Sequence, residues 1–392
     1  MSQQLAYVIV TPYSLYKSRT GGILSRLISR TGLDLVAMRM FAPSAELVKE
    51  YAAEIVSAED PQDRKIQEEL REYILKNLGP DAKTGRHRRV MMMLFRGEDA
   101  VRKVRSVVGN LSPDRRGGET IRDTYSDLII DEDNGQVRYF EPAVLAAPNE
   151  REAEIKLKLW AKFSDKDGGI IENTIAHPAG QAPERTLVLI KPDNFNFPTG
   201  RPGNVIDFFS RTGLYIVGVK VLHMSLAQAL EFYGPVRDVL RTKLKEGVSE
   251  RAKNVLEKEF NFKISPDAQK ALGDILGPIH GDNQFDVIMR FMTGFTAAER
   301  PSPEEQKKPG SQKCIALVYE GVNAVRKIRD VLGPTDPSKA PPGSIRREFG
   351  SNITVNAAHA SDSVENAQRE FKIVQPGENN LKQVVEAAYG KL

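Results

Sequence analysis

The sequence has 392 residues, of which 40% are hydrophobic and 28% are charged. This length exceeds that of one ordinary hydrophobic core, so we expect two domains, and the composition is typical of a soluble globular protein. The 56 basic and 52 acidic residues leave a net charge of +4, which is too small by itself to indicate nucleic-acid binding. Short basic clusters at 86–89 and 115–116 are interpreted as solvated loop charge.

The single cysteine, Cys314, excludes an intrachain disulfide and a Cys-x-x-Cys metal site. It precedes the apolar run 315–318 and is predicted to be a buried residue at the end of a strand. The apolar run at 5–10, near the N-terminus, is too short for a signal peptide or a membrane span. We therefore expect a soluble protein of the reducing cytoplasm with no membrane partner.

The chain is a diverged duplication. The segment Ser-Arg-Thr-Gly-Leu at 29–33 recurs letter for letter at 210–214, and the block at 97–105 matches the block at 321–329. These blocks keep their order along the chain. The repeat is therefore the size of a domain and is not a solenoid of short units.

Each half is predicted to fold as strand, helix, strand, helix, strand and helix, from the period of its apolar residues. In the first half we expect strand 8–10, helix 23–28, strand 35–40, helix 45–55 and strand 90–94. In the second half we expect strand 187–190, helix 205–209, strand 216–221, helix 226–240 and strand 314–318. Both predicted helices 23–28 and 205–209 end before a Thr-Gly pair that fits a C-cap. This order favours an α+β fold: two tandem ferredoxin-like domains, each an antiparallel four-stranded sheet with helices.

The domain boundaries are predicted from changes in composition. We expect a first domain at 1–163, a Gly- and Pro-rich linker at 164–183, a second domain at 184–376 and a C-terminal tail at 377–392. The second domain carries long insertions near 241–284 and 296–312, and the tail contains a short predicted helix at 380–389.

One histidine stands in a setting that suits phosphoryl transfer. His359 lies in the segment Asn356-Ala-Ala-His359-Ala-Ser361-Asp362-Ser363, just before a predicted helix. A neutral imidazole beside phosphate-binding groups is a good phosphoryl acceptor near pH 7. The segment 335–346 supplies a hydroxyl, a rigid loop and a cation upstream. Phosphoryl transfer through a phosphohistidine is therefore the leading hypothesis.

The surrounding residues suit this chemistry. Phosphoryl transfer requires a protein mainly to position groups and to neutralise charge on phosphate oxygens. Arg329 and Arg346 each offer a planar fork of donors, whereas Lys191 offers a point charge. Thr335 lies in a Pro-bounded turn, so its hydroxyl needs little ordering when it binds a ligand.

The helix after the histidine is predicted to orient it. Asp362 or Ser363 can cap this helix, and Glu365 fits the capping-box position counted from Asp362. Glu370 is seven residues after Ser363 and hence on the same helical face, where its carboxylate can hold one nitrogen of His359. The chain lacks the P-loop, the GxGxxG and the HRD sequence motifs, so side chains must bind any nucleotide.

Residues 184–376 resemble a nucleoside diphosphate kinase, and residues 1 to about 160 resemble a degenerate copy. The matching blocks, taken together and in order, are 185–193, 320–325, 332–337, 342–346 and 356–363. The resemblance implies a ping-pong reaction in which the γ-phosphate of ATP or another nucleoside triphosphate passes to His359 and then to a nucleoside diphosphate. It also implies that Mg²⁺ assists and is carried by the nucleotide phosphates, with no ligand from protein side chains.

The resemblance assigns roles to ten residues. It implies that His359 is the phosphorylated nucleophile and that Glu370 orients it. The residues implied to contact phosphates or sugar are Lys191, Tyr233, Arg329, Thr335, Arg346 and Asn356. The residues implied to enclose the base are Phe285 and Ile353. The chain departs from the family at Ala360, where the family has Gly, at Thr354-Val355, where the family has Gly-Arg, and in the longer turn at 194–202.

The first half has lost this chemistry. The replaced positions are Thr11 for Lys191, Leu111 for Thr335 and a residue near Ala143 for the histidine, whereas Tyr51, Arg105 and Arg122 persist. Without an imidazole no covalent intermediate can form. We therefore hypothesise that the first domain is an inactive partner that packs as the second subunit of an intrachain pseudo-dimer. Whether the chain assembles further into a homo-oligomer stays open.

Two alternatives belong to other classes. The first is a catalytically weak nucleotide-binding regulatory protein. The second half retains every catalytic position, which argues against this alternative. The second is an RNA- or DNA-binding module, since ferredoxin-like sheets serve that use. The sheet-face aromatic pattern of RNA-recognition domains is missing and the charge is nearly balanced, so we expect no specific nucleic-acid partner.

Overall fold

The computed structural model describes residues 3–112, 117–131, 133 and 135–392, so the basic pair at 115–116 lies outside the described residues. The described chain divides into two compact units. The larger unit contains the residues up to Leu222, Ile315–Phe371 and Gln375–Leu392. The smaller unit contains His223–Cys314 and Lys372–Val374.

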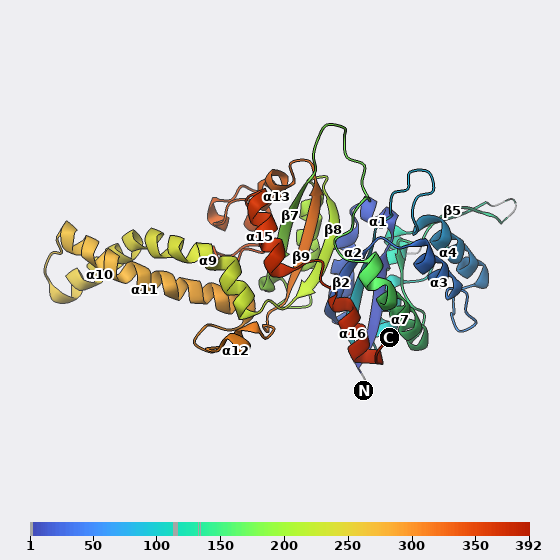
Figure 1. The fold of residues 1–392 in the computed structure, drawn as a ribbon, viewed down its shortest axis with the longest axis horizontal. Coiled ribbons are helices and arrows are strands. Elements are labelled where there is room, and N and C mark those ends of the chain that lie inside the picture. The colour runs from blue at the N-terminus through green and yellow to red at the C-terminus, as the bar shows by residue number, and fades with distance from the viewer. Residues whose placement is uncertain (1–2, 113–116, 132, 134) are drawn as a thin grey trace. The chain divides into compact units, whose positions relative to one another are not determined.

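Among the described residues, the strands form two four-stranded sheets and one two-stranded sheet (Figure 1). The first sheet has the order β2-β3-β1-β6. Its strands are β1 (Gln3–Val10), β2 (Asp34–Phe41), β3 (Val90–Glu98) and β6 (Val144–Leu145). Its helices are α1 (Pro12–Tyr16), α2 (Thr20–Thr31), α3 (Ala45–Ala53), α4 (Arg64–Asn77), α5 (Ala100–Val108), α6 (Ile121–Tyr125) and α7 (Glu150–Asp167). The small sheet pairs β4 (Asp127–Ile130) with β5 (Val137–Glu141).

The second sheet repeats this arrangement with the order β10-β7-β9-β8. Its strands are β7 (Glu184–Ile190), β8 (Tyr215–Leu222), β9 (Cys314–Gly321) and β10 (Ala358–Ala360). Its helices are η1 (Pro192–Asn194), α8 (Arg201–Ser210), α13 (Ala324–Leu332), η2 (Pro337–Lys339), α14 (Ile345–Phe349) and α15 (Val364–Val374). Helix α16 (Asn380–Tyr389) follows in the C-terminal tail and contacts β1 and β2 of the first sheet. The predicted fold class, tandem ferredoxin-like domains with antiparallel four-stranded sheets and helices, is confirmed.

Several local predictions can be compared with the structure. Gly32 caps α2 in the left-handed conformation with φ 62°, as the Thr-Gly pair predicted. The same prediction was wrong for α8, whose C-cap is Arg211, with Gly213 two residues further along. Cys314 is buried at the start of β9, as predicted. Helix α7 continues through Asp167, four residues beyond the predicted end of the first domain at 163.

Within the larger unit the two halves of the duplication contact each other through α2 and α8. These helices approach so closely that a Cβ added to Gly203 would lie 2.1 Å from the carbonyl oxygen of Gly21. The Ser25 hydroxyl also donates a 2.7 Å hydrogen bond to the Gly200 carbonyl. Strand β2 contacts β8, and helix α16 packs against α7.

The smaller unit contains the predicted helix 226–240 together with the insertions predicted for the second half. Its helices are α9 (Leu226–Lys243), α10 (Lys245–Phe260), α11 (Pro266–Thr293) and α12 (Pro303–Lys307). Helix α11 packs along both α9 and α10 (Figure 1). Asp282 joins α11 to α9, because its carboxylate accepts a 2.8 Å hydrogen bond from Arg241 and a 2.9 Å hydrogen bond from Arg237. No helix in the described part of the chain is both long and apolar enough to cross a membrane.

Candidate active site

The short strand β10 places His359 at the edge of the second sheet. His359 pairs with Leu189 of β7. The strand follows a tight backbone turn in which Ala357 has φ 69°, a conformation that is uncommon for residues other than glycine. Two hydrogen bonds hold the Ala357 carbonyl, from the Lys191 amide at 2.9 Å and from the Asn194 side chain at 2.7 Å. The departure at Ala360 introduces no such strain, because Ala360 lies in β10.

Glu370 holds His359 from helix α15. Its Oε1 lies 3.0 Å from Nε2 of His359, and its Oε2 accepts a 2.5 Å hydrogen bond from the Ser361 hydroxyl. Glu370 is 4% exposed and Ser361 is fully buried. Ser363 caps α15 by accepting a hydrogen bond from the Asn366 amide, so the predicted capping box between Asp362 and Glu365 was wrong. A Ser363 cap puts Asn366, and not Glu365, at the N3 position.

The side chain of Asn356 connects several of the predicted site residues. Its Oδ1 accepts a 2.7 Å hydrogen bond from Nζ of Lys191, which also donates to the Thr354 carbonyl at 3.1 Å. Its Nδ2 donates to the carbonyls of Thr335, at 3.1 Å, and Ile353, at 2.9 Å. Asn356 is 1% exposed and Lys191 is 7% exposed, so these hydrogen bonds are largely shielded from solvent.

The two predicted arginines differ in their surroundings. Arg346 is 8% exposed and donates to the carbonyls of Gly333, at 3.0 Å, and Ala358, at 3.3 Å. Arg329 is exposed in the last turn of α13 and lines a cavity of about 410 Å³ together with Asp362. Thr335 is exposed in the turn before η2, and Ile353 is 53% exposed.

The remaining two predicted residues belong to the smaller unit. Tyr233 lies on α9, where its ring centroid is 4.9 Å from that of Phe232. Phe285 lies on α11, is 3% exposed and has the guanidinium of Arg237 5.6 Å above its ring centroid. The structure thus brings His359 together with Glu370, and Asn356 together with Lys191, Thr335 and Ile353, all within the larger unit.

Three side chains that the sequence did not single out support the turn after Lys191. Arg201 donates to Asp193 at 2.8 Å and to Asn194 at 3.1 Å, and it also contacts the Phe349 carbonyl. Burial raises the pKa of Asp193, and the charges of Arg201 and Lys191 offset this rise only in part. The run Pro192-Asp193-Asn194 directly after the first strand was a signal for this arrangement, because short polar residues there can bond the turn.

The first half preserves the framework of the site without its histidine. Val10 and Ile9 pair with Val144 and Leu145, as Ile190 and Leu189 pair with Ala358 and His359. Leu145 therefore occupies the histidine position, two residues after the predicted Ala143. Ala143 itself has φ 62° and matches Ala357.

At the position of Lys191 the first half has Thr11. The Thr11 hydroxyl donates a 2.9 Å hydrogen bond to Glu141, whose other carboxylate oxygen accepts a 2.8 Å bond from Tyr73. Burial raises the pKa of Glu141. A hydroxyl and a buried carboxylate thus replace the cation of the second half.

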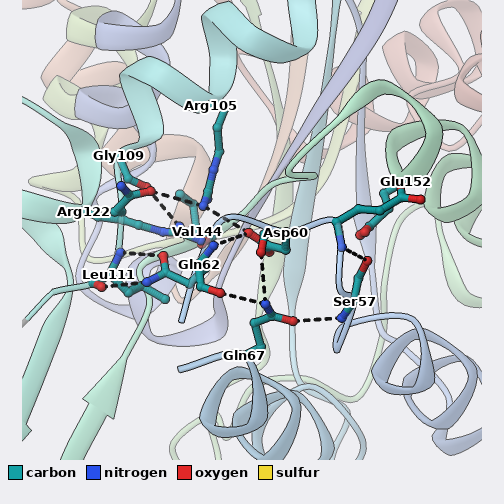
Figure 2. Close-up of polar contacts among 12 residues, drawn as sticks. Ser57, Asp60, Gln62, Gln67, Arg105, Gly109, Leu111, Arg122, Val144 and Glu152 are labelled. Atoms are coloured by element: carbon teal, nitrogen blue, oxygen red, sulfur yellow. Dashed lines mark hydrogen bonds and ion pairs between the residues drawn. The ribbon is translucent and has the colours of Figure 1, made fainter. Parts of the chain in front are cut away.

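Arg122 of the first half repeats the contacts of Arg346. It donates to the carbonyls of Gly109, at 3.0 Å, and Val144, at 3.2 Å (Figure 2). Burial, with a smaller contribution from the charge of Arg105, lowers the pKa of Arg122 to about 9.

Comparison with known proteins gives one family. The sequence model of the family described as nucleoside diphosphate kinase matches residues 4–160, 184–241 and 304–379, well over half of the chain. The nucleoside diphosphate kinase of Anaeromyxobacter sp. (strain Fw109-5) is 31% identical over 195 residues, covering 50% of this chain and 91% of that protein. The nucleoside diphosphate kinase of Wolinella succinogenes is 32% identical over 188 residues, covering 48% of this chain and 92% of that protein.

Solved structures of similar proteins carry the same description. The nucleoside diphosphate kinase of Aquifex aeolicus is 26% identical, with 51% of this chain and 99% of that chain covered and a TM-score of 0.30. An NDP kinase from Pyrobaculum aerophilum is 25% identical, with 49% of this chain and 95% of that chain covered and a TM-score of 0.33.

Proposed function

Because the chain belongs to the nucleoside diphosphate kinase family, we propose that it transfers the γ-phosphate of a nucleoside triphosphate to a nucleoside diphosphate through phospho-His359. Residues 184–376 would form the catalytic domain and residues 1–163 its inactive partner. The observation that carries this proposal is the 3.0 Å contact between Nε2 of His359 and the buried carboxylate of Glu370. That contact gives the imidazole a fixed direction and a fixed tautomer.

The tautomer determines which nitrogen attacks. When Nε2 carries the proton and donates to Glu370, the lone pair available for attack is on Nδ1. Nδ1 forms a bond to the γ-phosphorus while the bond from that phosphorus to the bridging oxygen breaks, and the nucleoside diphosphate leaves with the electron pair. The carboxylate of Glu370 stabilises the positive charge that develops on the ring. In the second half-reaction a terminal oxygen of another nucleoside diphosphate attacks the phosphohistidine and restores the neutral imidazole.

The cations of the site would bind the phosphates. Lys191 and Arg346 are both buried and are held by neutral acceptors, so their charges are placed before a nucleotide arrives. Preorganised charge of this kind stabilises the transition state of phosphoryl transfer more than flexible charge does. The exposed Arg329 and the Thr335 hydroxyl would add donors on the solvent side.

A magnesium ion fits this set of residues only as part of the nucleotide. Glu370, the acidic side chain in contact with His359, already holds His359 and Ser361. The described residues contain no group of three or more His, Cys, Asp or Glu side chains suited to a metal ion. We propose that Mg²⁺ enters on the phosphates, where it neutralises charge on their oxygens.

The proposal also assigns residues to the base and the sugar of the nucleotide. Ile353 is 53% exposed and has an apolar surface available for a base. Phe285 is 3% exposed, so stacking on a base would require this ring to become accessible. Tyr233 and Asn356 would contact sugar or phosphate. Stacking alone distinguishes bases weakly, so we expect broad nucleoside tolerance.

We also propose that the first half acts as the second subunit of an intrachain pseudo-dimer. The close contact of α2 with α8 at Gly21 and Gly203 supports this, because only residues without a side chain permit that approach. A location in the reducing cytoplasm is proposed from the single buried thiol, Cys314.

The proposal is tested by incubating the full chain with [γ-³²P]ATP. The account predicts an acid-labile, alkali-stable label on the protein, its transfer to added GDP, and its loss in His359→Ala. His280→Ala, which removes a histidine of α11, serves as the matched control and keeps the label. A label that survives in His359→Ala would overturn the proposal.

A further inference from the structure

The loop between α3 and α4 of the first half is fixed by its own side chains (Figure 2). The side chain of Gln67, which is 3% exposed, accepts a 2.8 Å hydrogen bond from the Ser57 amide and donates a 2.7 Å bond to the Gln62 carbonyl. The carboxylate of Asp60 accepts a 2.9 Å hydrogen bond from the Gln62 amide. These bonds give residues 57–67 one defined conformation.

This loop covers the segment that corresponds to the proposed phosphate-binding turn. Leu111 stands where the second half has Thr335, and its backbone exchanges two hydrogen bonds with the side-chain amide of Gln62, at 3.0 and 3.2 Å. Leu111 is 3% exposed and packs with Ile66 and Leu128. The turn that would face a nucleotide in the second half is therefore closed by the first half's own chain.

The same loop brings a carboxylate to the retained arginines. Oδ1 of Asp60 lies 3.7 Å from Nη2 of Arg105, and both side chains are 13% exposed. Arg122 is 2% exposed, and its Nε has no hydrogen-bond partner among the residues that the structure describes. Two buried guanidinium groups repel each other, and the negative charge of Asp60 acts favourably on both.

We propose that the first half retains a latent site for a diphosphate group, formed by Arg105 and Arg122, which the Asp60 carboxylate and residues 57–67 keep closed. Arg105 and Arg122 correspond to Arg329 and Arg346, so this assignment rests on the proposed function, in which those residues bind phosphates. Asp60 supplies in the folded protein the negative charge that a nucleotide phosphate would supply. The first half is then inactive for a second reason beyond the missing histidine: its phosphate position is already filled.

The site should open when the carboxylate is removed. Asp60→Asn keeps an oxygen for the Gln62 amide but removes the charge that opposes an incoming anion. Glu59→Gln is the matched control, because it removes one negative charge from the same loop, where the Glu59 side chain is 51% exposed and its carboxylate pairs with the surface residue Arg151. Inorganic diphosphate is the probe, titrated calorimetrically into each full-length protein.

The account predicts that Asp60→Asn binds one more equivalent of diphosphate than the wild type and Glu59→Gln, and that Asp60→Asn with Arg105→Ala loses this extra equivalent. The readout is the number of equivalents bound by Asp60→Asn minus the number bound by the wild type, so it does not depend on whether the second half binds diphosphate. A failure of the proposed function would lower the wild-type stoichiometry and leave the difference unchanged. If Asp60→Asn does not fold, Asp60→Ser replaces it, because a serine hydroxyl can also accept from the Gln62 amide. A folded variant of either kind with no extra equivalent would overturn the proposal.

Discussion

The amide oxygen of Asn356 lies 2.7 Å from the ammonium nitrogen of Lys191, and both side chains are at least nine-tenths buried. This contact joins the end of β7 to the loop that leads into β10. An ammonium that lost this acceptor would stay buried with one hydrogen bond fewer, which is unfavourable in a desolvated place. The position of Lys191 therefore depends on a neutral residue that is distant in sequence.

We accordingly predict that Asn356→Ala weakens both folding and phosphorylation. Loss of the Lys191 contact and of the bonds to Thr335 and Ile353 should lower the free energy of unfolding by about 1–3 kcal/mol, measured by urea denaturation. The rate of histidine phosphorylation should fall as well. Asn366→Ala is the control, because Asn366 is partly exposed and its side chain bonds only to Asp362 in the described structure. An Asn356→Ala protein as stable and as active as the wild type would show that Lys191 is held by other contacts.

Glu370→Gln should slow phosphorylation of His359 without unfolding the protein. Glutamine keeps an oxygen that can accept from Nε2 but loses the negative charge that stabilises the ring. We expect a decrease of about tenfold or more in the single-turnover rate, equivalent to about 1.4 kcal/mol. Glu365→Gln, which removes an exposed carboxylate from the same helix, should leave the rate unchanged. Equal rates in both variants would count against an orienting role for Glu370.

Ser361→Ala should have a smaller effect in the same direction. Its buried hydroxyl donates the 2.5 Å hydrogen bond that fixes the second oxygen of Glu370. Loss of this bond should reduce stability by about 1–2 kcal/mol and slow phosphorylation severalfold. Ser351→Ala, at an exposed position, provides the comparison. No change in the rate on Ser361→Ala would mean that α15 alone positions Glu370.

Gly203→Ala should destabilise the contact between the two halves. The added Cβ would lie 2.1 Å from the Gly21 carbonyl oxygen and 2.3 Å from the Ser25 hydroxyl, so α2 and α8 would have to separate. We expect a loss of about 1–3 kcal/mol in the free energy of unfolding. Gly247→Ala in α10 meets nothing within 4 Å and should stabilise its helix by about 1 kcal/mol. A stabilising Gly203→Ala would contradict the close packing of the halves.

The pH dependence of stability should include a contribution from Asp207, on α8. Burial raises the pKa of Asp207 to about 6, and hydrogen bonds from the Gly21 and Gly22 amides offset this only in part. The unfolded chain ionises near pH 4, so between about pH 4 and 6 the folded state binds more protons and stability falls as pH rises. After allowance for partial solvent exposure we expect a loss of roughly 1–2 kcal/mol. Asp207→Asn should remove this slope in urea denaturation, whereas Asp238→Asn at an exposed position should not.

Elements with a clear local signal could be predicted from the sequence. The strands at 8–10 and 187–190 were found as short apolar runs followed by proline, and the helix at 380–389 was also found. Strands β6 and β10 contain two and three residues, which is too short for a period to show. Their place is determined by pairing with β1 and β7, which is a tertiary effect.

Some contacts of the site could likewise be predicted from the sequence, and others depend on tertiary structure. The spacing from Ser363 to Glu370 predicted a carboxylate near the histidine, because a helix fixes what lies on one face. Asp362 and Ser363 are both good capping residues, and Ser363 is the one that caps α15. The predicted capping box was wrong because it was counted from Asp362. The support from Ser361, the bond between Asn194 and Ala357, and the approach of Asp60 to Arg105 depend on how separate segments fold together. No local pattern encodes them.

The proposal that phosphoryl transfer runs through His359 is tested most directly by mass spectrometry of the full chain after treatment with ATP, beside the His359→Ala variant. The account predicts one phosphoryl group, located on the peptide that contains His359 and removed when GDP is added. No phosphoryl group is expected on the first half of the chain, where Leu145 occupies the histidine position, and none is expected on His359→Ala. A phosphoryl group on another residue, or one that GDP does not remove, would contradict the account.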